Sequence, residues 1–175
     1  MRVIKALENR RLGRKLMRII TILATAALMG AGATAASAAS VTKSIDVAAA
    51  PSAVWAAIGP FCSIKDWHPA IGQCTTDGKT PPTRTLVAKD GKATFVETET
   101  ARDDKADSYS YKIDSSPLPL TGYVSTISVA AKAGGSTVTW TSTFTPAAGK
   151  DDAASGAVGG IYQGGLDAIK AKFAK

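Results

Sequence analysis

The sequence has few of the residues from which most enzyme and metal sites are built. Among 175 residues there are two cysteines and a single histidine. A hydrolase triad would need that histidine, His68, beside a serine and an acid, and no nucleophile-elbow pattern is present. The glycines at 156, 159, 160, 164 and 165 follow no P-loop spacing and lack its Lys-Ser/Thr pair. These absences argue against a serine hydrolase and against a P-loop nucleotide-binding protein.

Long hydrophobic runs are also missing, except for one near the N-terminus. Seven Lys and Arg side chains precede an apolar run from Ile19 to about Ala33, and the sequence Ala36-Ser37-Ala38 then fits a signal-peptidase site. The run is short and interrupted by Thr and Gly, which favours a cleavable signal over a spanning helix. No cysteine follows the run to carry a lipid anchor.

We therefore expect a cleavable signal peptide over residues 1–38 and one exported domain over residues 39–175. The mature protein would be periplasmic or secreted, with no stable membrane anchor after cleavage. Translation starts either at Met1 or at Met17, since Arg18 alone could serve as the charge of a conventional signal.

Removing the signal also removes the basic charge of the chain. The full sequence has 21 Lys and Arg against 14 Asp and Glu, a net charge of +7. Residues 1–38 hold seven of the basic and one of the acidic side chains, so 14 and 13 remain and the net charge falls to +1. A nearly neutral domain lacks the electrostatic footprint of a nucleic-acid-binding protein, and we expect no nucleic-acid partner.

Export changes the interpretation of Cys62 and Cys74. In an oxidising compartment two cysteines of a small domain usually pair, and closing a loop of about 13 residues stabilises the fold by on the order of 3 kcal/mol. Two alternatives stay open at this point: a pair of buried thiols, or a metal site that includes His68, which lies midway between them. The spacing matches no recognised zinc pattern, so we expect no metal and no cofactor.

The clearest structural pattern is the stretch from Ser136 to Thr145. Every odd position from 137 to 145 is threonine, and the even positions are Val138, Trp140, Ser142 and Phe144. A period of two predicts a strand with its threonines toward water and Trp140 and Phe144 toward a core. Apolar residues then recur at helical spacing, at Val158, Tyr162, Leu166, Ile169 and Phe173. This stripe predicts a C-terminal helix across the apolar face of the sheet.

The rest of the domain has the pattern of a strand, two short helices and an antiparallel meander. We expect the first strand over residues 40–48 and two helices, from Pro51 to Ile58 and from Phe61 to Trp67. Further strands are expected near 72–77, 83–88, 93–102, 107–114, 122–132 and 136–146. Residues 147–160 are expected to be a flexible lead into the last helix, and Asp151 and Asp152 suit the start of that helix through its macrodipole. The glycines of that helix indicate either close approach to the sheet or room for a ligand, and both predict glycines on its sheet-facing side; the alternative is a frayed, exposed segment.

This order of elements resembles the helix-grip fold of the START-like, polyketide-cyclase (SRPBCC) superfamily. The motifs that carry the resemblance are Ala50–Trp55, Trp67–Ile71, Tyr109–Ile113, Ser116–Pro119, Val138–Trp140 and Gly164–Ile169. The stretch Trp67-His68-Pro69-Ala70-Ile71 and the export signal are most similar to MxaD-like periplasmic accessory proteins of bacterial methanol oxidation. The resemblance implies an α+β fold, in which a curved antiparallel sheet of about seven strands wraps on a long C-terminal helix and leaves an apolar cavity between them.

The resemblance and strand parity together name a set of candidate ligand-binding residues. These are Trp67, His68, Glu97, Glu99, Tyr111, Leu118, Tyr123, Trp140, Phe144, Tyr162 and Leu166. If Glu97 and Glu99 point into a dry cavity, burial raises their pKa and they could act as an acid, as a base or as an anchor for a polar group of a ligand. If they lie on the other face of the strand, both carboxylates are solvated. The aromatic residues serve equally as core or as cavity wall, and Leu118 lies in a Pro-Leu-Pro loop suited to a lid.

Three functions follow, in order of preference. The first is an exported protein that binds a small apolar or amphipathic molecule between the sheet and the last helix. The second is a periplasmic accessory protein that interacts with a redox enzyme, as in methanol oxidation. The third is a polyketide cyclase- or dehydratase-like enzyme that uses Glu97, Glu99, Tyr111 or His68 as acid and base.

Overall fold

The computed structural model describes residues 37–174, so almost all of the predicted signal peptide lies outside the described residues. The described chain contains seven strands and three helices. In order these are β1 (Ala39–Val47), α2 (Pro51–Ile58), α3 (Ile64–Trp67), β2 (Ile71–Thr76), β3 (Thr83–Ala88), β4 (Thr94–Asp103), β5 (Ser108–Ser115), β6 (Leu120–Lys132), β7 (Gly135–Pro146) and α4 (Asp151–Lys172). Among these residues no helix is both long enough and apolar enough to cross a membrane.

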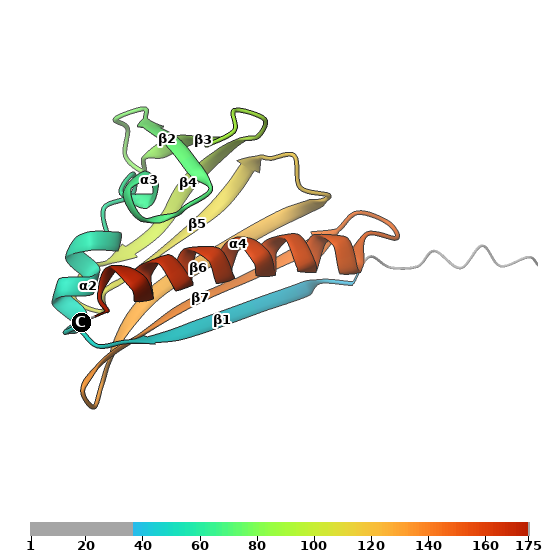
Figure 1. Cartoon of the computed structure of the whole chain (residues 1–175). Helices are drawn as coiled ribbons and strands as arrows, with labels where there is room; N and C mark the ends of the chain where they lie inside the picture. Colours follow the sequence, from blue (N-terminus) through green and yellow to red (C-terminus); the bar gives the residue numbers. More distant parts are fainter. Residues whose placement is uncertain (1–36, 175) are drawn as a thin grey trace, which may run out of the picture. The chain divides into compact units, whose positions relative to one another are not determined.

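The seven strands form one antiparallel sheet with the order β1-β7-β6-β5-β4-β3-β2. Strands β2 to β7 are a meander, in which each strand pairs with the next through a short connection. Strand β1 pairs with β7, so the two edges of the sheet are β1 and β2, and the short helices α2 and α3 carry the chain from one edge to the other. Helix α4 lies across one face of the curved sheet (Figure 1). The predicted helix-grip architecture is confirmed.

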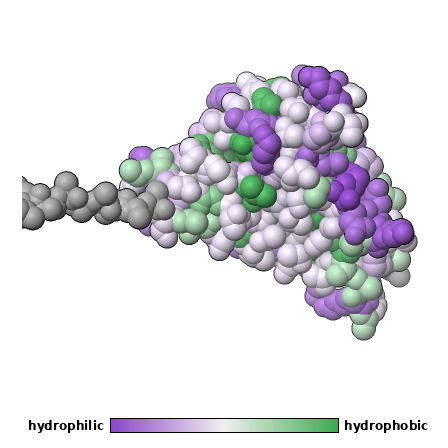
Figure 2. Space-filling model, turned by 180° about the vertical axis from the view of Figure 1, so that it is seen from behind, coloured by the Kyte–Doolittle hydropathy of each residue, from purple (hydrophilic) through white to green (hydrophobic). Residues whose placement is uncertain are grey.

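Strand β7 determines the two faces of the sheet. Its even-numbered residues from Ser136 to Phe144 are buried, and its threonines lie on the opposite face, half-buried or exposed. The hydroxyl-bearing face extends across the neighbouring strands. Thr141 pairs with Thr42 of β1 on one side and with Thr126 of β6 on the other, and Thr126 pairs in turn with Ser110 of β5. Seen from behind, this side of the molecule is mostly pale, as expected for serine and threonine (Figure 2).

Helix α4 begins ten residues earlier than its glycine-rich sequence suggests. The prediction of a flexible segment over residues 147–160 is wrong beyond Lys150, because the helix starts at Asp151. Ala154 and Val158 are fully buried under this first half, so packing on the sheet outweighs the low helix propensity of glycine. Apolar contact over the whole length of the helix therefore sets its start.

The glycines of α4 differ in their surroundings. An added Cβ at Gly156 or Gly160 would meet no atom within 4 Å, and both residues are exposed, so the prediction that they face the sheet is wrong. At Gly165 an added Cβ would lie 2.7 Å from His68 and 3.0 Å from Trp140 and Trp67. Close approach therefore applies at Gly165, where α4 meets α3 and β7.

Cys62 and Cys74 form a disulfide with a Cα–Cα distance of 5.5 Å. The bond ties the loop before α3 to strand β2, at the edge of the sheet. Because both sulfurs are used in the bond, the alternatives of free thiols and of a metal site with His68 do not apply in this structure.

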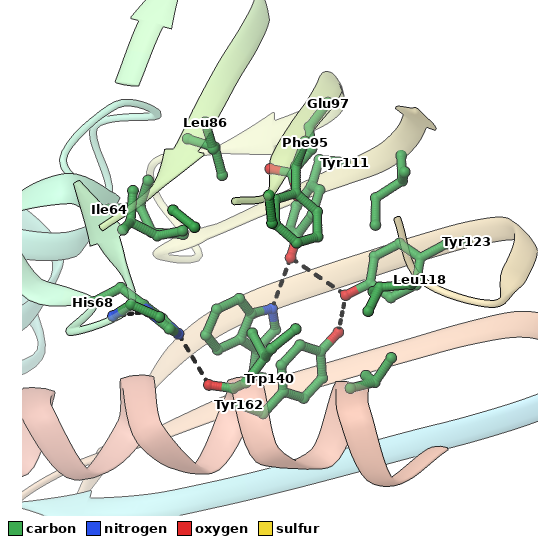
Figure 3. Close-up of a pocket in the computed structure, with 17 residues that line it drawn as sticks. Ile64, His68, Leu86, Phe95, Glu97, Tyr111, Leu118, Tyr123, Trp140 and Tyr162 are labelled. Atoms are coloured by element: carbon green, nitrogen blue, oxygen red, sulfur yellow. Dashed lines mark hydrogen bonds between the residues drawn. The ribbon is translucent and has the colours of Figure 1, made fainter. Parts of the chain in front are cut away.

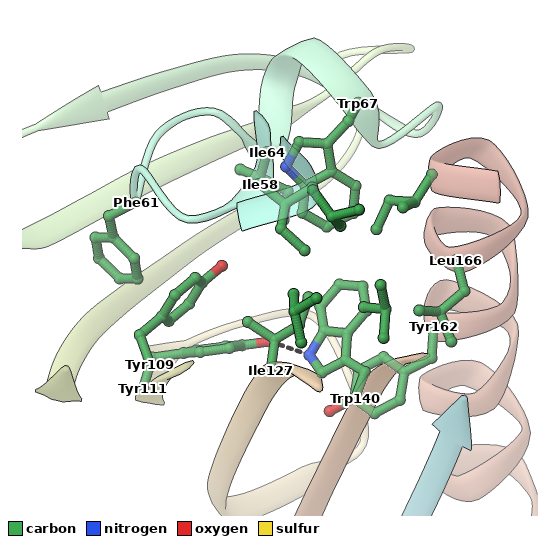
Figure 4. Packing of buried hydrophobic residues seen from close by; sticks show 14 of the residues in the cluster. Ile58, Phe61, Ile64, Trp67, Tyr109, Tyr111, Ile127, Trp140, Tyr162 and Leu166 are labelled. Atoms are coloured by element: carbon green, nitrogen blue, oxygen red, sulfur yellow. Dashed lines mark hydrogen bonds between the residues drawn. The ribbon is translucent and has the colours of Figure 1, made fainter. Parts of the chain in front are cut away.

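The buried core joins the short helices to the middle of the sheet. Figure 4 shows Trp67 and Ile64 of α3 facing Trp140 of β7, with Tyr162 and Leu166 of α4 closing the other side. Aromatic contacts run through this region, such as the edge-on contact between Trp67 and Trp140 at 5.7 Å. The space between the sheet and α4 is thus filled by side chains near α3, and a cavity lies further along α4.

Candidate functional site

A cavity of about 230 Å³ lies between the sheet and the middle of α4. Figure 3 shows side chains from α3, from the sheet and from α4 converging on it. The lining residues are Ile64, His68, Ala70, Ile71, Leu86, Ala88, Ala93, Phe95, Glu97, Tyr111, Ile113, Leu118, Tyr123, Trp140, Val158, Ile161 and Tyr162. Most of them are apolar, as in small-molecule sites, and the polar groups gather in two places.

Trp140 and Tyr162 form the wall where the sheet meets the helix. Their rings are stacked, with centroids 4.3 Å apart and planes inclined by 13°. Trp140 points toward α4 because it occupies an even, inward position of β7, and Tyr162 lies on the buried stripe of α4. The indole Nε1 of Trp140 donates to Oη of Tyr111 and to Oγ of Ser125, both at 3.1 Å.

The first polar group of the cavity is a chain of hydroxyls. Tyr111 lies 3.5 Å from Tyr123 through their hydroxyl oxygens, Tyr123 contacts Tyr162, and Tyr162 lies 2.8 Å from Ser125. Ser125 in turn donates to the carbonyl oxygen of Thr141 at 2.8 Å. Burial raises the pKa of each of these three tyrosines above its usual value, so all of them stay protonated at neutral pH. The chain therefore offers neutral donors and acceptors and no ready base.

The second polar group is a buried ion pair. Arg84 is completely buried, and its Nε donates to Oε2 of Glu97 at 2.7 Å. Nη2 lies 2.7 Å from the same oxygen without the alignment of a hydrogen bond. Nη1 donates to the carbonyl of Phe61, and the guanidinium lies 4.0 Å from the centre of the Phe61 ring. Glu97 therefore points inward, and the alternative of a solvated carboxylate does not apply to it.

The two charges of this pair have opposite responses to burial. Burial raises the pKa of Glu97, while the charge and the hydrogen bond of Arg84 oppose that rise. Burial is the largest effect on Arg84 and lowers its pKa, but the charge and hydrogen bond of Glu97, together with the nearby Tyr109 and Tyr111, outweigh it, so the pKa of the guanidinium lies above its usual value. Arg84 is charged at any physiological pH, and it keeps a carboxylate next to an apolar cavity.

Glu99 has a different environment from Glu97, although it lies two residues away on the same strand. It is bound by Arg102, whose Nη2 lies 2.9 Å from Oε2, and Arg102 also donates to the carbonyl of Gly59. The pairing of β4 with β5 is irregular between Glu99 and Ala101, so the strand bends away there. Glu99 does not line the cavity.

His68 lines the cavity but has both ring nitrogens occupied. The backbone N–H of Ala70 donates to Nδ1 at 3.2 Å, so the ring hydrogen lies on Nε2, which donates to the carbonyl of Ile161 at 3.0 Å. Burial lowers the pKa of His68, which favours this neutral tautomer. The contact with Ile161 fastens α3 to α4, and it leaves no lone pair free for a general base.

Seven of the eleven predicted ligand-binding residues line the cavity. They are His68, Glu97, Tyr111, Leu118, Tyr123, Trp140 and Tyr162. The other four, Trp67, Glu99, Phe144 and Leu166, lie outside its lining. Trp67 and Leu166 belong to the solid core around α3, and Phe144 stacks on Tyr123 with centroids 6.1 Å apart. Whether any of the eleven binds a ligand stays a prediction.

Sequence reasoning missed Arg84, although a signal was present. Arg84 alternates with Leu86 on β3, so both belong to the inward face of that strand. An arginine at an inward position needs a buried partner, and Glu97 is opposite it in the β3–β4 register. Ser125 was missed in the same way, because it alternates with Tyr123 and Ile127 on β6.

No group of three or more His, Cys, Asp and Glu side chains that could hold a metal ion occurs within residues 37–174. The cavity chemistry is that of apolar and aromatic walls, one carboxylate fixed by an arginine, and neutral hydroxyls. This arrangement suits recognition of a small, mostly apolar molecule with few polar atoms.

Comparison with known proteins agrees with this fold. The family described as polyketide cyclase / dehydrase and lipid transport matches residues 38–174. The chain belongs to this family, which is part of the SRPBCC superfamily. None of the curated proteins compared with the chain matches it.

Solved structures of proteins similar to this chain superpose on about three quarters of its length. The protein XoxI from Bacillus cereus is 36% identical with a TM-score of 0.73, and the match covers 77% of this chain and 95% of that one. A protein from Thermobifida fusca is 27% identical with a TM-score of 0.69, covering 77% and 92%. Ara h 8.0201, at 18% identity and a TM-score of 0.64, covering 78% and 98%, shares the fold alone.

Proposed function

We propose that this protein binds a small apolar or amphipathic molecule in the cavity between the sheet and α4, and that it does so after export. The observation that carries the proposal is the 230 Å³ cavity, with its mostly apolar wall and two localised polar groups. A core of this size normally packs without such space, so side chains that leave it open indicate a ligand.

A thermal-shift experiment on the exported protein tests the proposal. The protein would be screened against extracted lipids and small aromatic compounds, and native mass spectrometry would search for a ligand that copurifies. A ligand at about 100 times its Kd would raise the Tm by roughly 5 to 10 °C. A panel in which nothing raises the Tm and nothing copurifies would contradict the proposal.

A cavity-filling variant makes the test specific to this site. Ala88 lines the cavity, and Ala88→Phe would place a ring in the space. We expect this variant to keep the fold and to lose the ligand-induced rise in Tm. Ala130→Phe, at an exposed position of β6, is the matched control and should keep that rise.

A second candidate function is that of a periplasmic accessory protein of a redox system such as methanol oxidation. It is favoured by the resemblance of the Trp67–Ile71 stretch to MxaD-like proteins and by the 36% identity with XoxI. Under this function a redox enzyme would be captured from periplasm by the wild type and equally by Ala88→Phe, since the cavity would not matter. Loss of capture in Ala88→Phe would favour ligand binding instead.

The geometry gives less support to a cyclase- or dehydratase-like enzyme. His68 has no free lone pair, Glu97 is neutralised by Arg84, and the buried Tyr111 is protonated. An acid–base mechanism would need one of these groups to be released when substrate binds. We therefore rank catalysis third.

A further inference from the structure

The direction of the hydroxyl chain can be worked out from its inner end. Two oxygens 2.8 Å apart need a hydrogen between them, and a carbonyl has none, so Ser125 donates its only hydrogen to Thr141. Ser125 must then accept from Tyr162, whose hydroxyl lies 2.8 Å away, and from Nε1 of Trp140. Tyr162 has thereby used its single hydrogen.

The hydroxyl hydrogens nearer the cavity have fixed directions as well. Because Tyr162 donates to Ser125, the hydrogen between Tyr123 and Tyr162 belongs to Tyr123. The hydrogen of Tyr111 is then directed at Tyr123 over 3.5 Å, a contact at the limit of a hydrogen bond. Among these four hydroxyl groups, the one of Tyr111 therefore makes only a weak hydrogen bond as a donor, to Tyr123 (Figure 3).

Glu97 supplies the matching acceptor on the neighbouring strand. Both contacts from Arg84 go to Oε2, and within the described chain no group donates to Oε1. Arg84 is itself completely buried and does not line the cavity. A ligand therefore meets the oxygen of a carboxylate and not the guanidinium.

The lining residues contain no lysine and no arginine, and their one histidine is neutral. A carboxylate or phosphate headgroup would be buried beside Glu97 without a cation to pair with it, which is strongly unfavourable. A hydroxyl group, in contrast, can accept from one neighbour and donate to another.

We propose that the ligand has a neutral hydroxyl head on an apolar body, that this hydroxyl accepts from Tyr111 and donates to Oε1 of Glu97, and that the site discriminates against carboxylic acids. This inference rests on the proposed ligand-binding function and narrows it to alcohols or phenols. An apolar cavity of about 150 Å³ holds one benzene, so 230 Å³ suits a body of roughly nine or ten non-hydrogen atoms.

Three compounds of similar shape separate the contributions of the head. 4-Propylphenol can donate and accept, 4-propylanisole can only accept, and 4-propylbenzoate is an anion at neutral pH. By calorimetric titration we expect the phenol to bind roughly 3- to 10-fold more tightly than the anisole and about 10- to 100-fold more tightly than the benzoate. An anisole or a benzoate that binds as tightly as the phenol would overturn the inference.

Glu97→Gln should reverse the order of affinity of the phenol and the benzoate. An amide can donate to a carboxylate, and Arg84 would lose its counter-charge, so the benzoate should gain affinity while the phenol loses it. Glu99→Gln removes the same charge two residues away, outside the cavity, and should leave the ranking unchanged. Equal effects of the two variants would contradict the role of Glu97.

Tyr111→Phe provides a second test that does not depend on the ion pair. It should lower phenol affinity by about 3- to 10-fold, whereas Tyr109→Phe, a buried β5 tyrosine outside the lining, should not. Unchanged phenol affinity in Tyr111→Phe would overturn the inference. If none of the three compounds binds the wild type and no other ligand is found, the proposed function itself fails, which is a separate result.

Discussion

At the scale of single residues, His68 is a fixed structural group between α3 and α4. It accepts from the backbone of Ala70 and donates to the carbonyl of Ile161, and burial lowers its pKa. Protonation would place a hydrogen on Nδ1, against the N–H of Ala70, and would break one of the two contacts. Because it is the only histidine in the chain, its titration can be followed alone.

This arrangement predicts how stability depends on pH. The folded pKa of His68 lies below the unfolded value near 6.5, so as the pH falls through 6.5 the unfolded chain takes up a proton that the folded chain does not. The free energy of unfolding should therefore decrease as the pH falls from about 7 toward 5. Urea unfolding of wild type and of His68→Gln across this range would isolate the contribution, since it is absent in the variant.

The imidazole signals in an NMR titration would check the same prediction independently. We expect them to show a midpoint below that of a free histidine. A midpoint at or above 6.5, or equal pH dependence in His68→Gln, would show that the ring is not held neutral.

The pair of Arg84 and Glu97 is the second feature that matters at the scale of single residues. Arg84→Met would leave a buried carboxylate without a counter-charge, and we expect it to lower the free energy of unfolding by about 3–5 kcal/mol. Glu97→Met should have a similar effect for the opposite reason. Denaturant unfolding measures both.

The double variant Arg84→Met/Glu97→Met is the decisive comparison. Replacing both partners by apolar side chains removes the unpaired charge, so much of the lost stability should return. If the two single effects instead simply add, then the ion pair does not hold in solution.

At the scale of elements, α4 combines two kinds of glycine. Gly165 allows the helix to approach His68 and Trp140, while Gly160 faces open space on the exposed side. The close approach at Gly165 brings the helix near enough for His68 to reach the carbonyl of Ile161. The helix is thus fixed at one point, and further along it leaves the cavity open.

Alanine substitutions should separate the two glycines. Gly165→Ala would force a methyl group against His68 at 2.7 Å, and we expect a loss of about 1–3 kcal/mol in spite of the better helix propensity. Gly160→Ala meets no neighbour and should stabilise the protein by up to about 1 kcal/mol. Thermal unfolding would compare them, and a stabilised Gly165→Ala would show that the contact is looser than described.

At the scale of the whole molecule, the disulfide agrees with the proposal that the protein is exported. Cys62 and Cys74 are bonded, which is usual for proteins that leave the cytoplasm. The predicted cleavage after Ala38 would leave β1 intact, because that strand begins at Ala39. Processing would thus release a chain that already contains every strand of the sheet.

Expression of the full chain in a bacterium tests this expectation. The protein recovered from periplasm or medium should begin near Ala39, and its intact mass should be about two hydrogens below that of the reduced form. Retention of residues 1–38 in the recovered protein, or its recovery only from the cytoplasm, would contradict the predicted signal peptide.

Much of the architecture could be predicted because the spacing of buried side chains, every second residue in a strand and every third or fourth in a helix, can be recognised within a short stretch of sequence. The alternation around Trp140 and the helical stripe ending at Phe173 identify which face of each element is buried, and the order of the elements then identifies the fold. The helical order of residues 151–160 could not be predicted from their composition, since burial of Ala154 and Val158 against the sheet outweighs the weak helix propensity of the glycines.

The candidate site also has features that follow from the sequence and features that depend on the tertiary structure. By itself the sequence determined that Tyr111, Tyr123 and Trp140 face inward, because side chains alternate along a strand whatever else surrounds it. Only the tertiary structure decided that these residues border open space while Trp67 and Leu166 fill the core, and that Glu97 meets Arg84. Those outcomes depend on the curvature of the sheet and on the height of α4 above it, which result from the packing of all elements together and appear in no single stretch of the chain.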